Sequence, residues 1–448
     1  MTLSVSRRTV LRACLAAGAG SVLPAGCTAS RGPGPAPAPT SGPPPTSGPP
    51  PTSGPPPTTG PGALPSPFAA PLVSTLRRFL KPTPENPRHP SYAGAVVLVA
   101  LGGDVVVHEA VGDALRYGNG PVELSPARRV AMRPDSIFDL ASITKVFTAL
   151  AVLQQVERGR LELDAPVADY LTGFGGGGGK AAVTVAQLLT HTSGLPVGVS
   201  LTGVTGRAAQ RNAILATPLV GGTRPGSVFR YSGLGLMVAG LLLEQVTGQR
   251  LDVVIREGLT APLGLRDTGF RPLDRLPADA RDRLVATDAR ANVRGLLRGV
   301  VHDSIANAVG GVAGHAGMFG SARDLAVLAQ ALLNGGEYGG TRVLAKATVD
   351  AMLVDRNAGL PVVDAYHPRR SPSHGLGFEL DQPWFMGRLA SPRTFGHTGF
   401  TGTSLVVDPA RGMVVVLLTS RAHPDWNWAD PDPVRVAVAD LIADRTAR

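Results

Sequence analysis

Valine-rich strand patterns at the two ends of the chain place the strongest constraint on its fold. Residues 93–101 and 104–111 flank a pair of glycines, and residues 403–407 and 413–419 flank a second short turn. Each pair of segments predicts a β-hairpin. A helix is predicted after the second hairpin, over residues 433–444. Because strands from both ends of a domain commonly pair in one sheet, we expect the sequence between the hairpins to form an insertion.

The expected insertion is mainly helical. Apolar residues recur at helical spacing over residues 183–189, 234–247, 251–259 and 322–334. These patterns predict an α+β fold that combines an antiparallel sheet with a helical region. We assign the sheet to about residues 87–141 and 375–448, and the helical region to about residues 142–374.

The first 27 residues have the features of an export signal. Arg7 and Arg8 resemble the twin-arginine motif, and a run of small apolar residues follows. The segment ends in Leu23-Pro24-Ala25-Gly26-Cys27, which resembles a bacterial lipoprotein box, so lipidation of Cys27 is predicted. Cleavage and secretion without a lipid is the alternative. The other cysteine, Cys14, lies within the signal, which excludes a disulfide framework and a cysteine-based zinc site.

Residues 28–86 are predicted to form a disordered stalk. From about residue 31 to residue 67 the chain is largely Pro, Gly, Ser and Thr, so it has little to bury in a core. A ligand for SH3-type domains is the other interpretation of such a segment. We expect a catalytic domain over residues 87–448 to be exported and held at the outer face of the cytoplasmic membrane, or secreted if Cys27 is not lipidated.

The distribution of charge does not favour nucleic-acid binding. The formal net charge is +10 at pH 7, but the arginines are scattered and no basic block is interleaved with aromatic residues. After the N-terminal segment, no apolar run is long enough to span a membrane.

A Ser-x-x-Lys pattern begins the apolar-periodic segment that follows residue 141. Apolar residues recur at Val146, Leu150, Leu153 and Val156, which predicts a helix with Ser142 in its first turn. The spacing places the Lys145 amine beside the Ser142 hydroxyl on one face of that helix. A serine hydroxyl needs a neighbour that takes its proton, and a lysine does so only when it is neutral. The pattern alone is weak, because such pairs also occur by chance on helix surfaces.

Two further stretches carry candidate functional residues. Phe229-Arg230-Tyr231-Ser232-Gly233 precedes a predicted helix, and its tyrosine is either an acid/base group or a core aromatic. The stretch over residues 395–402 contains Gly396-His397-Thr398-Gly399 and leads into the C-terminal hairpin. Its glycines allow close approach of a substrate or of another backbone segment, with a tight turn as the alternative.

Other suggestive patterns are incomplete. The run from Gly175 to Lys180 lacks the first glycine and the final Ser/Thr of a phosphate-binding loop. His108-Glu109 lacks the second histidine of a zinc-protease helix, and no Gly-x-Ser-x-Gly elbow occurs. His302, Asp303 and His315 suggest a metal site, but histidines in glycine-rich loops more often bond the backbone, so no metal is predicted.

Taken together, the three stretches resemble the serine β-lactamase and penicillin-binding protein superfamily. The resemblance is greatest to the branch that holds class C β-lactamases, D-alanyl-D-alanine carboxypeptidases and related esterases. It extends over about residues 90 to 445 and includes three further similar stretches, at residues 184–195, 262–270 and 310–319. It implies a β-lactamase-like fold, an antiparallel sheet with helices on both faces and a helical region.

The resemblance also implies a role for each motif residue. Ser142 would be the acylated nucleophile, Lys145 its proton acceptor and Tyr231 the second acid/base group. His397 would stand where many relatives carry lysine, followed by Thr398 and Gly399. The backbone N–H groups of Ser142 and Phe400 would form the oxyanion hole, each donor contributing about 3–4 kcal/mol.

The chain departs from the family pattern after the tyrosine. The third residue of that motif is usually Asn, and here it is Gly233. In the family that amide helps to hold the substrate amide and the lysine, so the glycine favours ester over peptide substrates. His397 would carry a pH-dependent charge where lysine carries a fixed one.

The sequence therefore predicts an exported serine hydrolase that acts through an acyl-enzyme on ester or small amide substrates. The alternatives within the same chemistry are a D-Ala-D-Ala carboxypeptidase and a β-lactamase. A cell-surface protein that binds a wall peptide without turnover is the alternative from another class. No cofactor is implied, and the expected partners are a small ester, amide or cell-wall peptide, with a membrane only through a lipid on Cys27.

Overall fold

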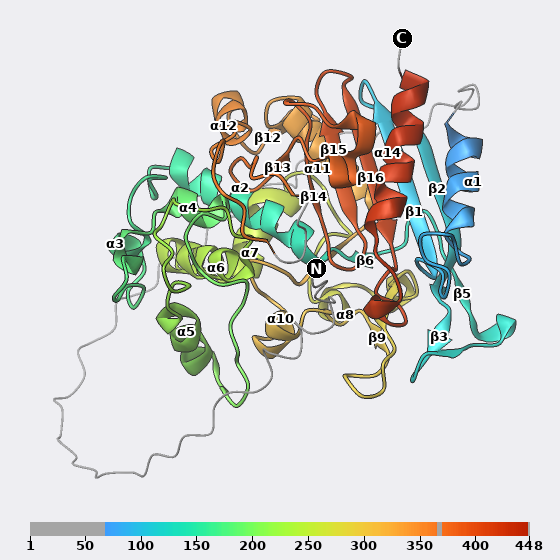
Figure 1. The fold of residues 1–448 in the computed structure, drawn as a ribbon, viewed down its shortest axis with the longest axis horizontal. Coiled ribbons are helices and arrows are strands. Elements are labelled where there is room, and N and C mark those ends of the chain that lie inside the picture. The colour runs from blue at the N-terminus through green and yellow to red at the C-terminus, as the bar shows by residue number, and fades with distance from the viewer. Residues whose placement is uncertain (1–67, 365–369, 447–448) are drawn as a thin grey trace, which may run out of the picture. The chain divides into compact units, whose positions relative to one another are not determined.

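An antiparallel sheet of seven strands runs through the part of the chain that the computed structural model describes, residues 68–364 and 370–446 (Figure 1). Strands β1 and β16 pair along their length, from Ala95 opposite Thr419 to Leu101 opposite Met413. The predicted pairing of the two terminal hairpins in one sheet is therefore confirmed. The strand order is β13 (Glu379–Leu380), β14 (Phe395–Thr398), β15 (Ser404–Asp408), β16 (Met413–Thr419), β1 (Gly94–Leu101), β2 (Asp104–Leu115) and β5 (Val130–Ala131).

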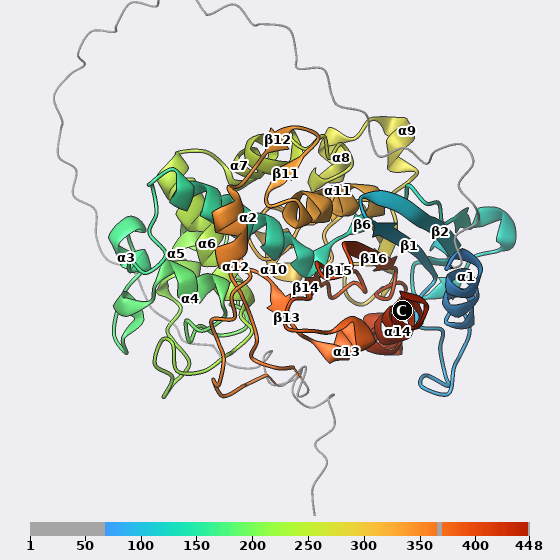
Figure 2. The same cartoon turned by 90° about the horizontal axis from the view of Figure 1, so that it is seen from above.

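The two faces of the sheet carry separate apolar layers, because neighbouring strand residues point to opposite sides. In β1, Val96 and Leu98 join one buried cluster, whereas Val97 and Val99 join the other. The second cluster includes α1 (Ala69–Arg78), α13 (Pro383–Met386) and α14 (Asp432–Thr446). The first includes α11 (Ala322–Leu333) and α2 (Thr144–Glu157). Figure 2 shows α11 on one face and α14 on the other, as the family resemblance implied.

Helix α2 connects the sheet to the helical region. Its residues from Thr144 to Gln155 are all buried. It packs against α6 (Gly233–Thr247), which in turn contacts α4 (Val185–Leu189) and α5 (Arg207–Ala216). The central position of α2, visible in Figure 1, explains why apolar residues occur on every side of it.

The predicted helix over residues 251–259 is not a continuous α-helix. Helix α7 covers Leu251–Ile255, and a wider π-type turn follows over Arg256–Thr260. The Gln154 side chain lies against this turn, where its Nε2 donates to the Gly258 carbonyl oxygen at 2.7 Å. A side chain inserted against a helix in this way opens the backbone ladder. The sequence pattern could not show this contact, because Gln154 comes from another helix.

Helical structure is present before the domain boundary expected at residue 87. Helix α1 lies within residues 28–86, which the sequence analysis assigned to a disordered stalk. Phe68, Leu72, Leu76 and Phe79 are buried and join the cluster under α14, so this segment does have apolar surface to bury. The predicted signal, Cys27 and the stalk up to residue 67 lie outside the described residues.

Short elements complete the described part of the chain, in which no helix is both long and apolar enough to cross a membrane. The remaining helices are α3 (Val167–Tyr170), α8 (Pro272–Arg275), α9 (Ala278–Arg281), α10 (Ser304–Ala308) and α12 (Lys346–Met352), with five short 3₁₀ turns. The remaining strands are β3 (Tyr117–Gly118), β4 (Val122–Glu123), β6 (Phe138–Asp139), β7 (Gly269–Phe270), β8 (Ala286–Asp288), β9 (Leu297–Arg298), β10 (Met318–Gly320), β11 (Glu337–Tyr338) and β12 (Thr341–Arg342).

Helix α1 is expected to contribute to the stability of the domain. The Leu76 side chain is fully buried against the sheet layer, so Leu76→Ala should lower the free energy of unfolding by about 2–5 kcal/mol. Ser74 is exposed on the same helix, and Ser74→Ala should change it by less than about 0.5 kcal/mol. Urea unfolding of both variants measures the difference. Equal stability of the two variants would show that α1 does not belong to the cooperative core.

Candidate active site

A strained turn presents Ser142 at the start of α2. Strand β6 ends at Asp139, and Ser142 lies in the 3₁₀ turn Ala141–Ile143 that precedes the helix. Ala141 has a φ of 48°, in the left-handed region that costs a residue with a side chain about 1–3 kcal/mol. The buried Asp139 carboxylate holds this turn, because it accepts from the backbone N–H groups of Ala141 at 2.9 Å and His302 at 2.7 Å.

Lys145 lies one helical turn further, beside the serine. Its Nζ is 2.7 Å from Ser142 Oγ and 3.0 Å from the carbonyl oxygen of His315. Burial lowers the pKa of Lys145 to about 7, against the opposing attraction of Asp303. A large fraction of this amine is therefore neutral near pH 7, whereas Ser142 remains partly exposed to solvent.

Tyr231 approaches the same pair from the loop before α6. Its ring centroid is 5.0 Å from Lys145 Nζ, and the Ser142 side chain is near enough to its hydroxyl to lower the pKa of the phenol. Burial raises the pKa of Tyr231, while Arg370 and the nearby Ser142 lower it. The net shift is upward, so the phenol keeps its proton at neutral pH. Its predicted convergence with the other two side chains is thus present in the structure.

The third predicted stretch forms strand β14 and the turn after it. His397 is buried, and its Nδ1 lies 2.8 Å from the Thr398 carbonyl oxygen. Burial and the nearby Lys145 hold the pKa of the His397 imidazole well below its ordinary value. His397 is therefore neutral at pH 7, and is not the cation that lysine provides in many relatives.

Gly399 lets this turn approach the nucleophile. A β-carbon there would overlap the Thr403 hydroxyl, lie 2.6 Å from the Leu140 carbonyl oxygen and lie 3.3 Å from Cβ of Ala141. The close contact brings Phe400, the next residue, beside the Ser142 turn. The Phe400 side chain is 47% exposed, so this end of the turn faces solvent.

Three residues at the site were not identified from the sequence. The ring of His191 lies 4.5 Å from that of Tyr231, and its Nδ1 accepts from the Ser232 backbone N–H at 3.1 Å. The Arg370 guanidinium lies 4.6 Å from the centre of the Tyr231 ring, and His315 contacts Lys145 through its carbonyl. His191 and His315 lie in the stretches 184–195 and 310–319. The similarity of these stretches to the family was the sequence signal that could have identified the two histidines. Nothing in the local sequence marked Arg370.

The residues of the other suggestive patterns form ion pairs or hydrogen bonds with neighbouring groups. His302 pairs with Asp288 at 3.3 Å and His315 with Asp303 at 3.2 Å, so the three residues considered for a metal belong to two separate pairs. Within residues 68–364 and 370–446, no three His, Cys, Asp or Glu side chains are placed to hold a metal ion. Lys180 is buried and donates to the Leu215 carbonyl oxygen, which accounts for the lysine of the glycine-rich loop.

Comparisons with known proteins agree with this geometry. A family model described as "Beta-lactamase" matches residues 76–440. The chain is 32% identical over 363 residues to a protein of Escherichia coli O157:H7 named "Putative D-alanyl-D-alanine carboxypeptidase", covering 74% of this chain and 79% of that protein.

Solved structures share the fold at lower identity. A class C β-lactamase from Rhodobacter sphaeroides is 21% identical, with a TM-score of 0.61 and coverage of 84% of this chain and 99% of that one. A family VIII carboxylesterase is 23% identical, with a TM-score of 0.59 and coverage of 84% and 98%. These likenesses concern the fold alone.

Replacing Gly399 tests how closely the turn after β14 must pack against the turn that carries Ser142. Gly399→Ala should lower the free energy of unfolding by about 1–3 kcal/mol, because the methyl group has no room beside Thr403 and Leu140. Gly175→Ala is the matched control, since nothing lies within 4 Å of a β-carbon there. Urea unfolding measures both, and an unchanged Gly399→Ala midpoint would contradict the close packing.

Proposed function

The chain belongs to the beta-lactamase family of serine hydrolases, and from this premise we propose that it hydrolyses small esters through an acyl-enzyme at Ser142. The observation that carries the proposal is the 2.7 Å contact between Lys145 Nζ and Ser142 Oγ, made by a buried amine whose pKa is about 7. This is the arrangement that a serine nucleophile requires, because a neutral base lies within hydrogen-bonding distance of its proton.

The proposed reaction has two stages. Neutral Lys145 takes the Ser142 proton as Oγ attacks the ester carbonyl, and the negative charge on the carbonyl oxygen is stabilised by the backbone N–H groups of Ser142 and Phe400. The tetrahedral intermediate collapses as the alcohol leaves with a proton relayed through Tyr231. A water molecule then attacks the acyl-enzyme, gives its proton to the same base system and releases the acid.

The protonation states fit these roles. Tyr231 has a raised pKa, so its hydroxyl keeps its proton at neutral pH, and it lies beside Lys145 and Ser142, whose oxygen must be reprotonated when the acyl group leaves. Ser142 and Tyr231 are partly exposed while Lys145 is buried, so substrate and water reach the reacting atoms and the base stays desolvated.

Substrate class is inferred from position 233. The asparagine common at this point of the family would help to hold a substrate amide, and Gly233 has no side chain to do so. We therefore favour esters. D-Ala-D-Ala carboxypeptidase activity is the second candidate, supported by the name of the relative at 32% identity.

The location of this activity is also a proposal. The twin-arginine-like segment and the lipobox-like ending at Cys27 support export and attachment to the outer face of the cytoplasmic membrane. Radiolabelled palmitate should enter the full-length chain and not its Cys27→Ala variant. Equal labelling of both chains would contradict the lipid anchor.

The rate of acylation should follow the titration of Lys145. With a pKa of about 7, the neutral amine increases with pH, so labelling by a fluorophosphonate should rise about tenfold per pH unit well below 7 and level off above it. Initial labelling rates, measured by intact mass at a series of pH values, report the midpoint. Ser142→Ala should not be labelled, and Lys145→Ala should be slower by about 10²–10⁴-fold. Labelling that persists in Ser142→Ala would place the nucleophile elsewhere.

Parallel assays separate the two candidate activities. We expect kcat/KM for a p-nitrophenyl ester of a short acid to exceed that for release of D-alanine from an N-acylated D-Ala-D-Ala peptide. Penicillin hydrolysis is measured alongside, and Ser142→Ala controls for background in each assay. Ser142-dependent release of D-alanine at a higher kcat/KM than the ester would establish the second candidate instead.

A further inference from the structure

The surroundings of Gly233 are filled by two other groups. Gly233 begins α6, and a β-carbon built on it would lie 2.9 Å from the Val197 carbonyl oxygen and 3.3 Å from Cδ2 of His315. The Gly233 backbone N–H also donates to the Val197 carbonyl at 2.8 Å, which fixes that contact. An asparagine at this position would need both neighbours to move. The imidazole of His315 thus lies directly beside the point where a side chain at position 233 would begin.

An acidic partner anchors His315. The ring is buried, and its Nε2 lies 3.2 Å from Oδ1 of Asp303. Asp303 also caps α10 by accepting from the Ala306 backbone N–H at 2.8 Å. Burial raises the pKa of Asp303, but the charge and hydrogen bond of His315 bring it well below its ordinary value. A buried acceptor of this kind fixes the orientation of the imidazole.

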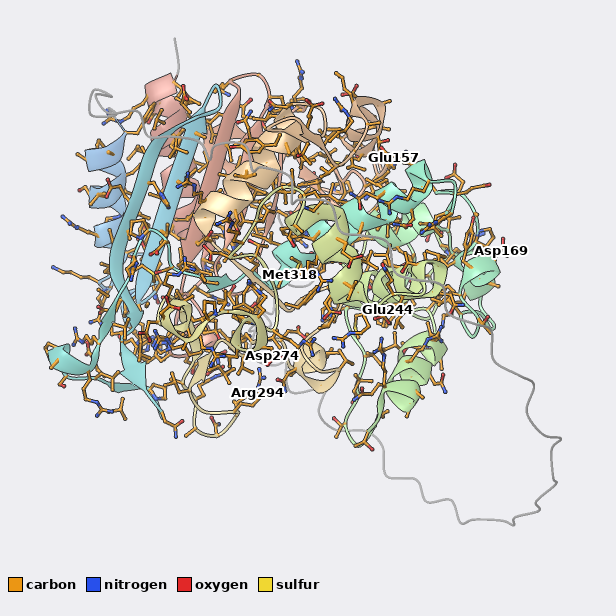
Figure 3. All side chains as sticks on the ribbon, turned by 180° about the vertical axis from the view of Figure 1, so that it is seen from behind. Glu157, Asp169, Glu244, Asp274, Arg294 and Met318 are labelled. Carbon is orange, nitrogen blue, oxygen red and sulfur yellow. The ribbon has the colours of Figure 1, made fainter. Side chains whose placement is uncertain are left out.

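The segment that contains His315 is bound along α2. Thr148 Oγ1 donates to the Gly314 carbonyl oxygen at 2.8 Å, and the Met318 backbone N–H donates to Thr144 Oγ1 at 3.1 Å. Met318 is labelled in Figure 3, where it marks the point at which this segment meets the nucleophile helix. Between these two bonds, Lys145 Nζ donates to the His315 carbonyl oxygen at 3.0 Å.

This bond determines where the lysine lone pair points. A neutral amine has two N–H groups and one lone pair in tetrahedral directions, so fixing one N–H limits the direction of the lone pair. With one N–H on the His315 carbonyl, the amine is left with its lone pair available to Ser142 Oγ, 2.7 Å away. A displacement of the carbonyl would turn the lone pair away from the serine proton.

We propose that His315, anchored by Asp303, is the positioning residue of Lys145. Its ring packs tightly beside the point where a β-carbon of residue 233 would lie, and its carbonyl oxygen holds the amine toward Ser142. The inference rests on the proposed acyl-enzyme function, and it explains how the site retains a second partner for the lysine without the usual asparagine.

The test compares three substitutions in the full-length chain. His315→Ala removes the ring and its anchor, so fluorophosphonate labelling of Ser142 should slow by about 10-fold to 10²-fold, as expected for a misplaced catalytic group. His315→Gln keeps a donor near the position of Nε2 and should restore most of the wild-type rate. Asp303→Asn keeps the cap of α10 but weakens the anchor, and its rate should fall between those of the other two.

Controls separate positioning from general destabilisation. His108→Ala removes a histidine that bonds the Pro134 carbonyl oxygen at 2.9 Å and lies in the sheet, away from the site, so its labelling rate should equal the wild-type rate. The thermal midpoint of each variant is measured with its rate. The rescue by His315→Gln is decisive when its thermal midpoint stays near that of His315→Ala, because refilled packing would raise the midpoint together with the rate.

Each outcome has a defined meaning. Slow labelling in His315→Ala with recovery in His315→Gln supports the proposal. Wild-type rates in His315→Ala, or equal losses in the alanine and glutamine variants, would overturn it while leaving the acyl-enzyme function intact. Failure of the wild-type protein to label at Ser142 would instead remove the proposed function, and this inference with it.

Discussion

The function of the contact between Lys145 and Ser142 depends on burial of the Lys145 amine away from water. Much of the surrounding structure contributes to that burial. Lys145 is 2% exposed on a helix whose other sides are also buried, so its charged form loses hydration, and no carboxylate among the described residues contacts it directly to compensate. The more distant Asp303 partly offsets this loss, which leaves the pKa of Lys145 near 7 instead of lower. The amine can therefore be buried and still exchange protons at neutral pH.

The ionisable side chains around Tyr231 also limit the net charge near Lys145. His191 and His397 are buried, and burial holds the pKa of each imidazole well below its ordinary value, so both are neutral neighbours of the lysine. Arg370 is the permanent cation next to the phenol, and Asp364 pairs with it at 2.7 Å. Glu379 also pairs with Arg370, at 3.6 Å, so the site combines an arginine held by two carboxylates with groups that remain uncharged at pH 7. This arrangement limits repulsion of a protonated lysine.

Close backbone packing holds these groups together. The sheet reaches the helical region at the end of β14, where Gly399 contacts the turn before Ser142. On the other side of α2, Gly314 lies so close to the Leu236 carbonyl of α6 that a β-carbon would overlap it. Glycines at both contacts let three segments from distant parts of the sequence meet at one serine. A shift at either contact would therefore change the geometry of the site.

Local patterns predicted the two terminal hairpins, the long helices α2, α6, α11 and α14 and the spacing of Ser142 and Lys145, because alternation and helical periodicity act over a few residues. They also placed Tyr231 in a motif, and the structure brings it to the serine. They did not predict α1, whose apolar residues stabilise the helix only when it packs against the sheet. They also gave no indication that Arg370 lies at the site. The sequence put Lys145 next to Ser142, but only the tertiary structure decided that the lysine is buried and bonded to His315. Burial and long-range hydrogen bonds arise from residues far apart in the chain, which no local pattern records.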